Sequence, residues 1–413
     1  MCANGISESG ELTAGERIKL RRLNRGLSRR VVANLVGRSE EWLRLVESGR
    51  QRLDSVRVIT RLAEVLRIDD LSVLIDWPLR QSPVAVGLAG EVLRVFRPII
   101  VDHPAIHVHT ELARRGRSIP EVAAELDRCQ EIWATSAHRY TVLTERLAWV
   151  LAASRDLRWR HRDAETGMLL VQAYQLAAQL LGRTGAHELA WTCADRSLAI
   201  AGQLDQPMLF AVSAWHIGSA LLHLSRNEEC HDYVEATAAY LVETAPDAID
   251  RTSRVALLGA LHLLAAKGAA GMLHLAEADR LTAAARQLAG ELTGDHEVLG
   301  LRFGPTEIAL AQIEMALDHG DFDAAIRIAA DVAIGDNYPI GGRSRYFIAL
   351  AYAFVRHGDD VAAAFALAKA ADACPEDLRH DRHAQRTLQH LLLHGNRLVR
   401  RDVARLAELA ELT

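Results

Sequence analysis

Residues 28–47 read SRRVVANLVGRSEEWLRLVE, and this stretch decides how the N-terminal part of the chain folds. Ser28 and Ser39 each stand directly before apolar residues at helical spacing, which is the position of a helix N-cap. The glycine after the first run supplies the left-handed residue that commonly ends a helix. The pattern predicts two short helices, residues 29–36 and 40–47, joined by a tight turn.

Another helix is predicted to precede this pair. It runs from residue 12 to residue 25, and its apolar positions are Ile18, Leu20 and Leu23. Gly26 ends it. Two short capped helices joined by a glycine turn are a helix-turn-helix signature, and in DNA-binding proteins the second helix of such a pair enters the major groove.

Basic residues gather in the same segment. From residue 17 to residue 61 there are thirteen Lys or Arg against four acidic residues, a net charge of +9. Because the whole chain carries −5, the remainder carries −14. A basic module on an acidic body is the pattern expected when one small part of a protein meets the phosphates of DNA.

The run from residue 15 to residue 69 resembles the lambda-repressor/Cro-like, or XRE-type, DNA-binding domain of about five helices, which we place at residues 11–76. The resemblance rests on R-x-x-x-G-L-S, the small Ala33, V-G-x-S and E-S-G-R. It implies a buried pair between Arg22 and Glu47. It also implies contacts to DNA from Arg29, Arg30, Ser39, Glu40, Glu41, Arg44, Ser48, Arg50 and Arg52, with Arg29 as a phosphate clamp and Ser48, Arg50 and Arg52 in a loop that touches the phosphate backbone.

The predicted recognition helix departs from the phage repressors. Glu40, Glu41 and Leu45 occupy the positions that read bases in those proteins. A carboxylate repels phosphate unless it accepts a hydrogen bond from cytosine N4. The helix dipole also favours Glu at an N-terminus by about 0.3–1 kcal/mol without any DNA. The sequence therefore predicts phosphate contacts and leaves two explanations for the glutamates.

Composition and helix breakers divide the rest of the chain. Trp77, Pro78 and Pro83 interrupt the helical pattern and predict a linker at residues 77–90. Residues 91–163 are predicted to be a connecting region, helical at 119–137 and 140–154 and interrupted by RPIIVDHP and RRGRSIPE. Residues 164–413 are predicted to form a repeat domain for sensing and dimerisation.

Four segments of this repeat domain share one frame, in which an apolar helix ends at a Gly or Ser turn and a small residue follows five positions later. These pairs are Gly185/Ala190, Ser225/Cys230, Gly320/Ala325 and Gly358/Ala363. The turns are 40 and 38 residues apart, and the pattern resembles tetratricopeptide (TPR) repeats of ~34 residues. A further unit is expected between residues 252 and 292, and the alternative is an unrelated helical bundle. Since aromatic residues make up only 5% of the chain, we predict an all-α protein, a lambda-repressor-like bundle followed by a TPR-like α-solenoid.

Stacked repeats turn one helix of each pair toward an inner groove. The frame places on that face Gln172, Gln175, Gln179, Trp215, Ser219, Glu307, Glu314, Arg345 and Tyr352. Three Gln on one helix face are unusual in a core because each buried amide needs partners. A peptide backbone offers such partners. The stripe thus predicts a site for a peptide or small-molecule signal, and an exposed polar face explains it equally well.

Several function classes lack support. Eighteen His and five Cys are scattered, and no H-E-x-x-H, C-x-x-C, phosphate-binding glycine loop or G-x-S-x-G occurs, so we expect no metal, no cofactor and no enzymatic activity. No apolar run approaches the ~18 residues of a membrane span. We expect a cytoplasmic protein without a membrane partner. Because 45 of the 48 basic residues are Arg, an actinobacterial source is expected.

Three further segments, RHRD, A-W-T-C-A-D-R-S-L and L-R-F-G-P-T-E-I-A, resemble Streptomyces-type XRE/TPR regulators, and the domain order resembles RRNPP-type peptide sensors. These resemblances imply a transcriptional regulator that binds a double-stranded DNA operator as a homodimer and senses a signal through its repeats. The alternative is a TPR protein-interaction scaffold whose helix-turn-helix no longer reads DNA.

Overall fold

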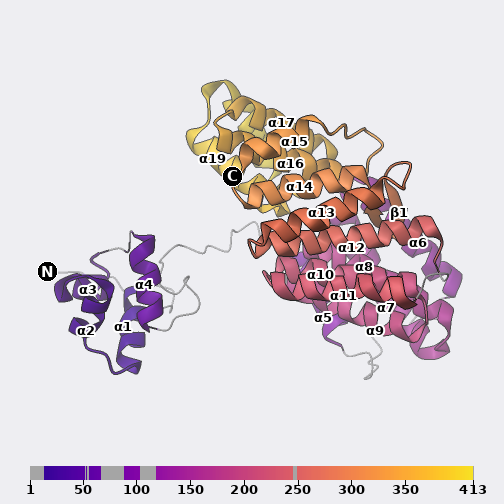
Figure 1. The fold of residues 1–413 in the computed structure, drawn as a ribbon, viewed down its shortest axis with the longest axis horizontal. Coiled ribbons are helices and arrows are strands. Elements are labelled where there is room, and N and C mark those ends of the chain that lie inside the picture. The colour runs from indigo at the N-terminus through magenta and orange to yellow at the C-terminus, as the bar shows by residue number, and fades with distance from the viewer. Residues whose placement is uncertain are drawn as a thin grey trace. The chain divides into compact units, whose positions relative to one another are not determined.

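The computed structural model describes residues 14–51, 53, 55–66, 88–102, 118–244 and 249–412. The chain divides into two compact units, Met1–Pro83 and Val84–Thr413, and each is described separately. Apart from one two-stranded hairpin, the regular elements in the described ranges are helices (Figure 1). The prediction of an all-α chain is confirmed, with this hairpin as the exception.

The N-terminal unit contains four helices within the described residues. They are α1 (Ala14–Asn24), α2 (Arg29–Val36), α3 (Glu40–Glu47) and α4 (Val56–Leu66). Both predicted N-caps form, because Ser28 Oγ accepts a hydrogen bond from Val31 N at 3.2 Å and Ser39 Oγ accepts one from Trp42 N at 3.1 Å. Gly37 ends α2 with a left-handed φ of 71°. The two helices joined by the turn therefore have their predicted bounds.

A single small core holds the four helices together. Its fully buried side chains are Ile18, Val32, Ala33, Leu43 and Leu62. Since α2 packs on α3 and α4 while α1 packs on α3, the orientation of α3 is fixed by its neighbours. The rest of the predicted five-helix domain, beyond residue 66, lies outside the described residues.

The second unit begins with α5 (Leu88–Val101), so residues 88–90 of the predicted linker are helical, and the preceding linker residues lie outside the described part. This helix corrects one expectation, because it continues through Pro98, where an interruption was predicted. Proline removes one hydrogen bond from a helix. The buried face compensates with four apolar side chains, Val92, Phe96, Ile99 and Ile100.

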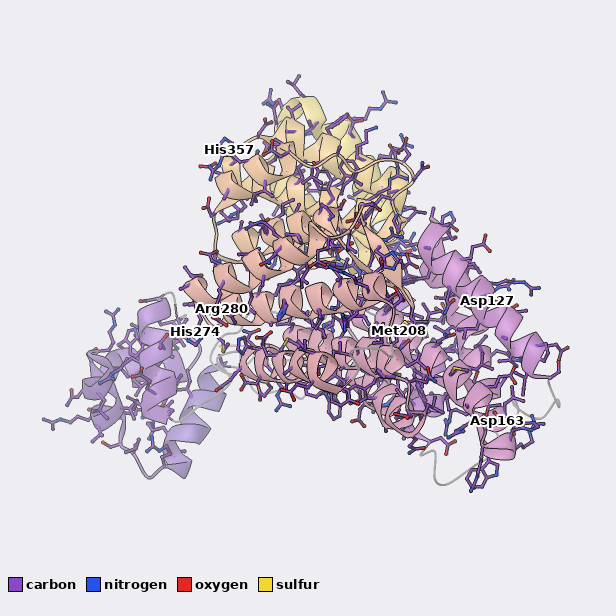
Figure 2. All side chains as sticks on the ribbon, turned by 45° about the vertical axis from the view of Figure 1, so that its right-hand side comes forward. Asp127, Asp163, Met208, His274, Arg280 and His357 are labelled. Atoms are coloured by element: carbon purple, nitrogen blue, oxygen red, sulfur yellow. The ribbon has the colours of Figure 1, made fainter. Side chains whose placement is uncertain are left out.

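The remaining helices follow one another with short connections. They are α6 (Ile119–Thr135), α7 (Arg139–His161), α8 (Ala164–Arg183), α9 (His187–Gln203), α10 (Pro207–His223), α11 (Asn227–Thr244), α12 (Arg251–Gly271), α13 (Leu275–Ala289), α14 (Pro305–Asp318), α15 (Phe322–Ala330), α16 (Ile340–His357), α17 (Asp360–Ala373), α18 (Asp377–His380), α19 (Arg382–His394), the short 3-10 helix η4 (Arg397–Val399) and α20 (Arg400–Leu409). Figure 2 labels Asp163, whose Oδ1 accepts a hydrogen bond from Thr166 N at 2.9 Å and caps α8. α7 is longer than the predicted helix at residues 140–154 because its middle is buried on all sides.

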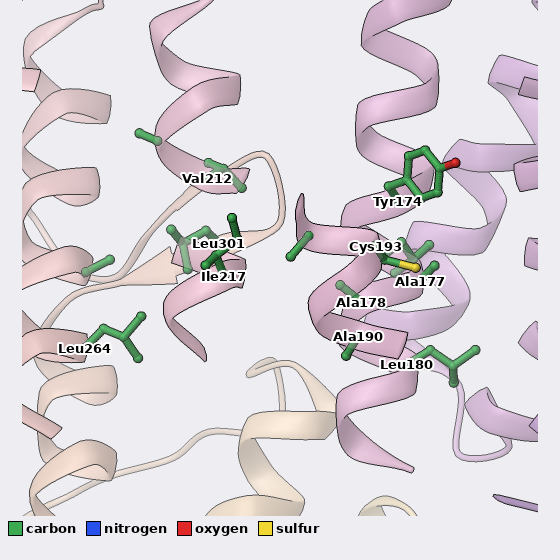
Figure 3. Close-up of a cluster of buried hydrophobic side chains, with 14 of the residues drawn as sticks. Tyr174, Ala177, Ala178, Leu180, Ala190, Cys193, Val212, Ile217, Leu264 and Leu301 are labelled. Atoms are coloured by element: carbon green, nitrogen blue, oxygen red, sulfur yellow. The ribbon is translucent and has the colours of Figure 1, made fainter. Parts of the chain in front are cut away.

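Helices α8 to α17 pack as successive antiparallel pairs, as the repeat frame predicts. All four predicted turn residues have positive φ, with Gly185 at 83°, Ser225 at 60°, Gly320 at 76° and Gly358 at 92°. The small residues five positions later are no more than 2% exposed and are Ala190, Cys230, Ala325 and Ala363. Figure 3 labels one of these residues, Ala190 of α9, beside Leu180 of α8. The extra unit expected between residues 252 and 292 is the pair α12 and α13.

A hairpin not expected from the sequence separates two of these pairs. Strands β1 (His296–Val298) and β2 (Leu301–Phe303) pair antiparallel, with Leu299 and Gly300 in the turn at φ of 49° and 79°. Phe303 packs so closely on α12 that a Cβ at Gly259 would lie 2.0 Å from its ring. Val298, Leu301 and Phe303 are at most 6% exposed. Burying a side chain of this size contributes about 1.5–3 kcal/mol, so the hairpin is an integral part of the body.

A buried junction joins α7, which precedes the repeats, to the segment that begins α18, which follows them. Arg139 Nη2 donates to both carboxylate oxygens of Asp377, at 2.8 and 2.9 Å, and the Tyr140 hydroxyl also donates to Asp377. Glu376 accepts a hydrogen bond from Tyr140 N at 2.8 Å and so caps α7. All four side chains are at most 2% exposed. A contact across more than 230 residues of chain therefore ties the helix before the repeats to the segment after them.

Candidate functional site

The outward face of α3 is the candidate DNA-reading surface. Glu40, Glu41, Arg44 and Ser48 are exposed along it, whereas Leu43, Val46 and Glu47 are buried on the opposite face. Ser39 forms the N-cap and is also exposed. The amphipathic pattern of α3 thus separates a structural face from a solvent face at the helix that a helix-turn-helix presents to DNA.

The structure brings Arg22 and Glu47 together and adds a third member. Arg22 Nε donates to Glu47 Oε1 at 2.6 Å and Arg22 Nη2 donates to Oε2 at 3.2 Å. Arg29 Nε donates to the same Oε2 at 2.7 Å. Burial alone would raise the pKa of Glu47, but the hydrogen bonds from both arginines lower it below its ordinary value. One carboxylate therefore ties the first helices of the unit to α3, and the predicted phosphate clamp Arg29 is partly engaged by it.

A second pair neutralises the solvent face of α3. Arg44 Nε and Nη2 donate to the two carboxylate oxygens of Glu41 at 2.7 and 2.6 Å. The hydrogen bonds from Arg44 lower the pKa of Glu41. Because both side chains are exposed, this fork opens at little cost when a stronger partner arrives. In the free protein, Glu41 thus pairs with Arg44, which is the one cation on α3.

Other predicted DNA contacts are available to solvent. Arg30 and Arg50 are exposed and form no ion pair with any described residue. Ser48 Oγ donates to Leu45 O at 3.0 Å, which holds the exit loop, and Leu45 is half-buried. Arg52 lies outside the described residues. Arg30 and Arg50 are thus the cations best placed to meet phosphate without first losing a partner.

Sequence reasoning missed one feature of this surface. Arg38 lies over the Trp42 ring with its guanidinium carbon 5.8 Å from the ring centroid. Trp42 is only half-buried. Together with Asn34, Gly37 and Ser39 these residues line a shallow depression of about 580 Å³ at the turn. The spacing of Arg38 and Trp42, four residues apart across the N-terminus of α3, is the signal that could have identified the pair.

We expect Arg50→Ala to weaken binding to specific and to random duplex alike, because a phosphate contact carries no sequence information. The slope of log affinity against log salt concentration should fall by about one for the lost contact. Titrations at several salt concentrations measure it, with Glu40→Gln as the control for a charge change on α3. A change confined to the specific duplex would assign Arg50 to base reading instead.

The glutamines predicted to line an open inner groove of the repeats are largely covered by other parts of the protein. Gln175 is 3% exposed, and its Nε2 donates to Ser213 Oγ of α10 at 3.0 Å. This corrects the expectation that its amide faces a ligand, since a partner inside the protein already satisfies it. Gln172 and Gln179 are half-buried. A Cβ at Gly300 in the hairpin turn would lie 4.0 Å from Gln179 Nε2, so the chain's own turn covers this end of the stripe.

The remaining predicted residues of this face fall into two groups. Trp215 packs against the main core with its ring 5.2 Å from that of His216, and Tyr352 lies between the rings of Phe322 and His383. Ser219 O accepts a hydrogen bond from His223 Nδ1 at 2.7 Å. Aromatic packing thus accounts for Trp215 and Tyr352.

Glu307, Glu314 and Arg345 do come together, in a charged cluster that also contains Lys267 and Tyr338. Arg345 donates to Glu307 and approaches Glu314 Oε1 at 3.2 Å. Lys267 Nζ donates to Glu314 Oε2 at 2.7 Å, and the Tyr338 hydroxyl donates to Glu307 at 2.5 Å. Burial alone would raise the pKa of Glu314, but Lys267 and Arg345 lower it to about 2. Side chains from three helices, joined by Tyr338 from the connection before α16, therefore form one ion network in which 18–31% of each charged side chain remains exposed.

Two classes of site are not found in the described part of the chain. Its His, Cys, Asp and Glu residues form no group of three or more that could hold a metal ion. None of its helices has the length and apolar character required to cross a membrane.

Comparisons with known proteins bear on the N-terminal unit. Residues 13–73 match the family described as Helix-turn-helix domain. A search of curated proteins gave no match. A solved structure of Bacillus thuringiensis PlcR in complex with the peptide PapR7 and DNA is similar over 67% of this chain and 94% of that chain, with 14% sequence identity and a TM-score of 0.33. A score this low carries no inference about ligands. The geometry of α2 and α3 and the family match agree that the N-terminal unit carries a helix-turn-helix domain.

Proposed function

We propose that this chain is a DNA-binding transcriptional regulator whose TPR-like repeats sense a peptide or small-molecule signal and control operator binding. The observation that carries the proposal is the helix-turn-helix of residues 13–73. Within it, residues 17–61 carry a net charge of +9 while the rest of the chain carries −14. An acidic body keeps off DNA and directs binding to the basic unit. The role is regulatory and not catalytic.

The proposal includes a homodimer of the XRE type on a double-stranded operator. One helix-turn-helix module buries little surface on DNA, and dimers gain affinity by pairing half-sites about one helical turn apart. A mobility shift on the gene's own upstream region at ~100 mM salt tests DNA binding. Footprinting then tests the dimer, which requires two half-sites; one uninterrupted half-site with a monomeric protein would contradict it.

The second candidate is a protein-interaction scaffold whose helix-turn-helix no longer reads DNA. The observation that favours it is the Glu41–Arg44 fork, which neutralises the reading helix. A protein that fails to shift its own upstream region and random duplex at ~100 mM salt would support the scaffold.

Glu41→Ala separates the two candidates further. Removing this carboxylate frees Arg44 and takes away a charge that faces phosphate, so we expect higher affinity for random duplex together with an altered base preference. Selection of binding sites from a random library, performed for the parent and the variant, measures the preference. Glu40→Ala on the same helix is the matched control because Glu40 is exposed and makes no ion pair with a described residue. Equal preferences for parent and Glu41→Ala would remove Glu41 from base reading.

A further inference from the structure

Three parallel helices of the body end in cations at one end of the same layer. Arg183 is the last residue of α8, His223 is the last residue of α10, and Lys267 lies four residues before the end of α12. His187 begins α9 and stacks on His223 with ring centroids 5.0 Å apart and an angle of 25° between the ring planes. The hairpin packs over the same layer, because Leu299 lies in a cluster with Val171 of α8 and Leu209 of α10, and a Cβ at Gly300 would lie 4.0 Å from Nε2 of Gln179 in α8. Figure 3 places Leu301 beside Val212 and Ile217 of α10.

These cations retain donors that the protein does not use fully. The Lys267 ammonium has three donors, and Glu314 takes one of them. The ion pairs of Arg183 with Asp377 and Asp381 span 3.7 and 3.9 Å, longer than ordinary hydrogen bonds. Their side chains are 31% and 28% exposed, so solvent reaches both. Arg345, by contrast, is matched by two carboxylates.

The two histidines add hydrogen-bonding atoms without a partner. Because a carbonyl oxygen only accepts, the hydrogen bond with Ser219 O places a proton on His223 Nδ1 and leaves Nε2 for another group. His187 Nδ1 is buried and has no partner in the described part of the chain. His223 is exposed at the surface, and the neighbouring His187, Lys267 and Arg183, each from a different helix, disfavour its protonation and so act to lower its pKa. Glu314, Asp377 and Asp381 already lie beside these cations, so an entering anion would be bound by the donors that those carboxylates leave free.

We propose that Arg183, His187, His223 and Lys267 form a recognition site for one anionic oxygen group, a carboxylate or a phosphate, on a short ligand. The ligand is short because a long extended peptide along these helices would meet the hairpin, whose Phe303 is 1% exposed and fills the space over Gly259. This inference rests on the proposed sensing role and names the chemistry of the signal.

The test is made on the full-length protein, in which lysines are few enough to be labelled and observed one by one. Only Lys19, Lys267 and Lys369 are present, so reductive methylation with ¹³C-formaldehyde, which preserves the charge, gives three side-chain NMR signals. The probes are inorganic phosphate, tetra-alanine with a free C-terminus, and the same peptide with a C-terminal amide. We expect phosphate or the free acid to shift the Lys267 signal saturably and the amide to leave it unchanged. Saturation by phosphate alone identifies a phosphate-bearing ligand, and saturation by the free acid identifies a carboxylate.

Calorimetry on variants assigns the site. Lys267→Met should weaken binding of the active anion at least about tenfold, Lys267→Arg should stay within about threefold of the parent, and the exposed Lys369→Met is the matched control. Two results would overturn the inference: saturation by the amide at the same concentration, or no saturation by either anion below about 10 mM. The cations would then be explained by their favourable interaction with the negative ends of the helix dipoles.

A mobility shift on the same sample separates this inference from the proposed function. Retained DNA binding without anion binding would refute the anion site alone. Anion binding without DNA binding would refute the regulator alone.

Discussion

Asp377→Asn is expected to destabilise the helical body by about 3–5 kcal/mol, because removing one partner of a buried ion pair leaves the other charge unpaired. Asp377 is 0% exposed and is the carboxylate that Arg139 and the Tyr140 hydroxyl share. Asparagine keeps the shape but not the charge, so the guanidinium of Arg139 remains in the interior. Trp133, whose ring centroid lies 4.4 Å from that guanidinium, reports the change by fluorescence.

Urea unfolding of the full-length protein measures the effect, with Asp372→Asn as the control because Asp372 is exposed on the adjacent α17. A loss below about 1 kcal/mol, the range of surface ion pairs, would show that the junction is not a stabilising contact.

The same group sets the acid response of the body. Burial would raise the pKa of Asp377, but Arg139 and Arg183 hold it well below its ordinary value. A carboxyl group with a lowered folded-state pKa contributes stability that is fully present above its unfolded pKa and is lost as the pH falls through the folded one. The parent should therefore lose stability steeply only in strong acid, and Asp377→Asn should flatten that part of the curve.

Glu47→Ala is expected to unfold most of the N-terminal unit while the body unfolds as in the parent. Two arginines donate to this carboxylate, and its loss costs about 3–5 kcal/mol. A domain of this size has only a few kcal/mol of stability in total. Hydrogen exchange should show loss of protection in α1, α2 and α3, and duplex binding should disappear.

Glu40→Ala on the solvent face of the same helix is the control for Glu47→Ala, and its protection should match the parent. Normal protection and normal DNA binding in Glu47→Ala would show that the Arg22–Glu47–Arg29 group does not hold α3 in place.

Local signals in the sequence predicted most of the helices correctly. The ends of the first helices are set by local residues: Ser28 and Ser39 cap their helices, and Gly37 ends one in a left-handed turn. The positive-φ turn residues of the repeats end their helices in the same way. The Arg22–Glu47 proximity followed from a resemblance and not from spacing. Where the decisive interaction lies within a few residues, pattern and structure agree.

Contacts between distant segments explain what the sequence did not reveal. The hairpin has strands of three residues, too short for a clear alternation, and its place depends on Gly259 of α12. The sequence alone predicts that Gln175 contacts a ligand. In the structure its hydrogen-bond partner is Ser213, which lies one repeat later in the chain. The cations Arg183, His223 and Lys267 stand about 40 residues apart and meet only because the repeats stack in register. No local pattern encodes these neighbours.

The junction between α7 and α18 also has a consequence during synthesis on the ribosome. Most of the body consists of neighbouring pairs that can form as soon as both helices emerge. Tyr140 and Asp377 are separated by 237 residues, so at 5–20 residues per second the N-terminus of α7 waits about 12–50 s for its partner. During that interval Arg139 and the backbone N–H groups at the start of α7 lack the carboxylates that later hold them. A nascent chain that stalls before Glu376 therefore presents an incomplete helix end, and the full set of repeats becomes one cooperative unit only when the last helices have been made.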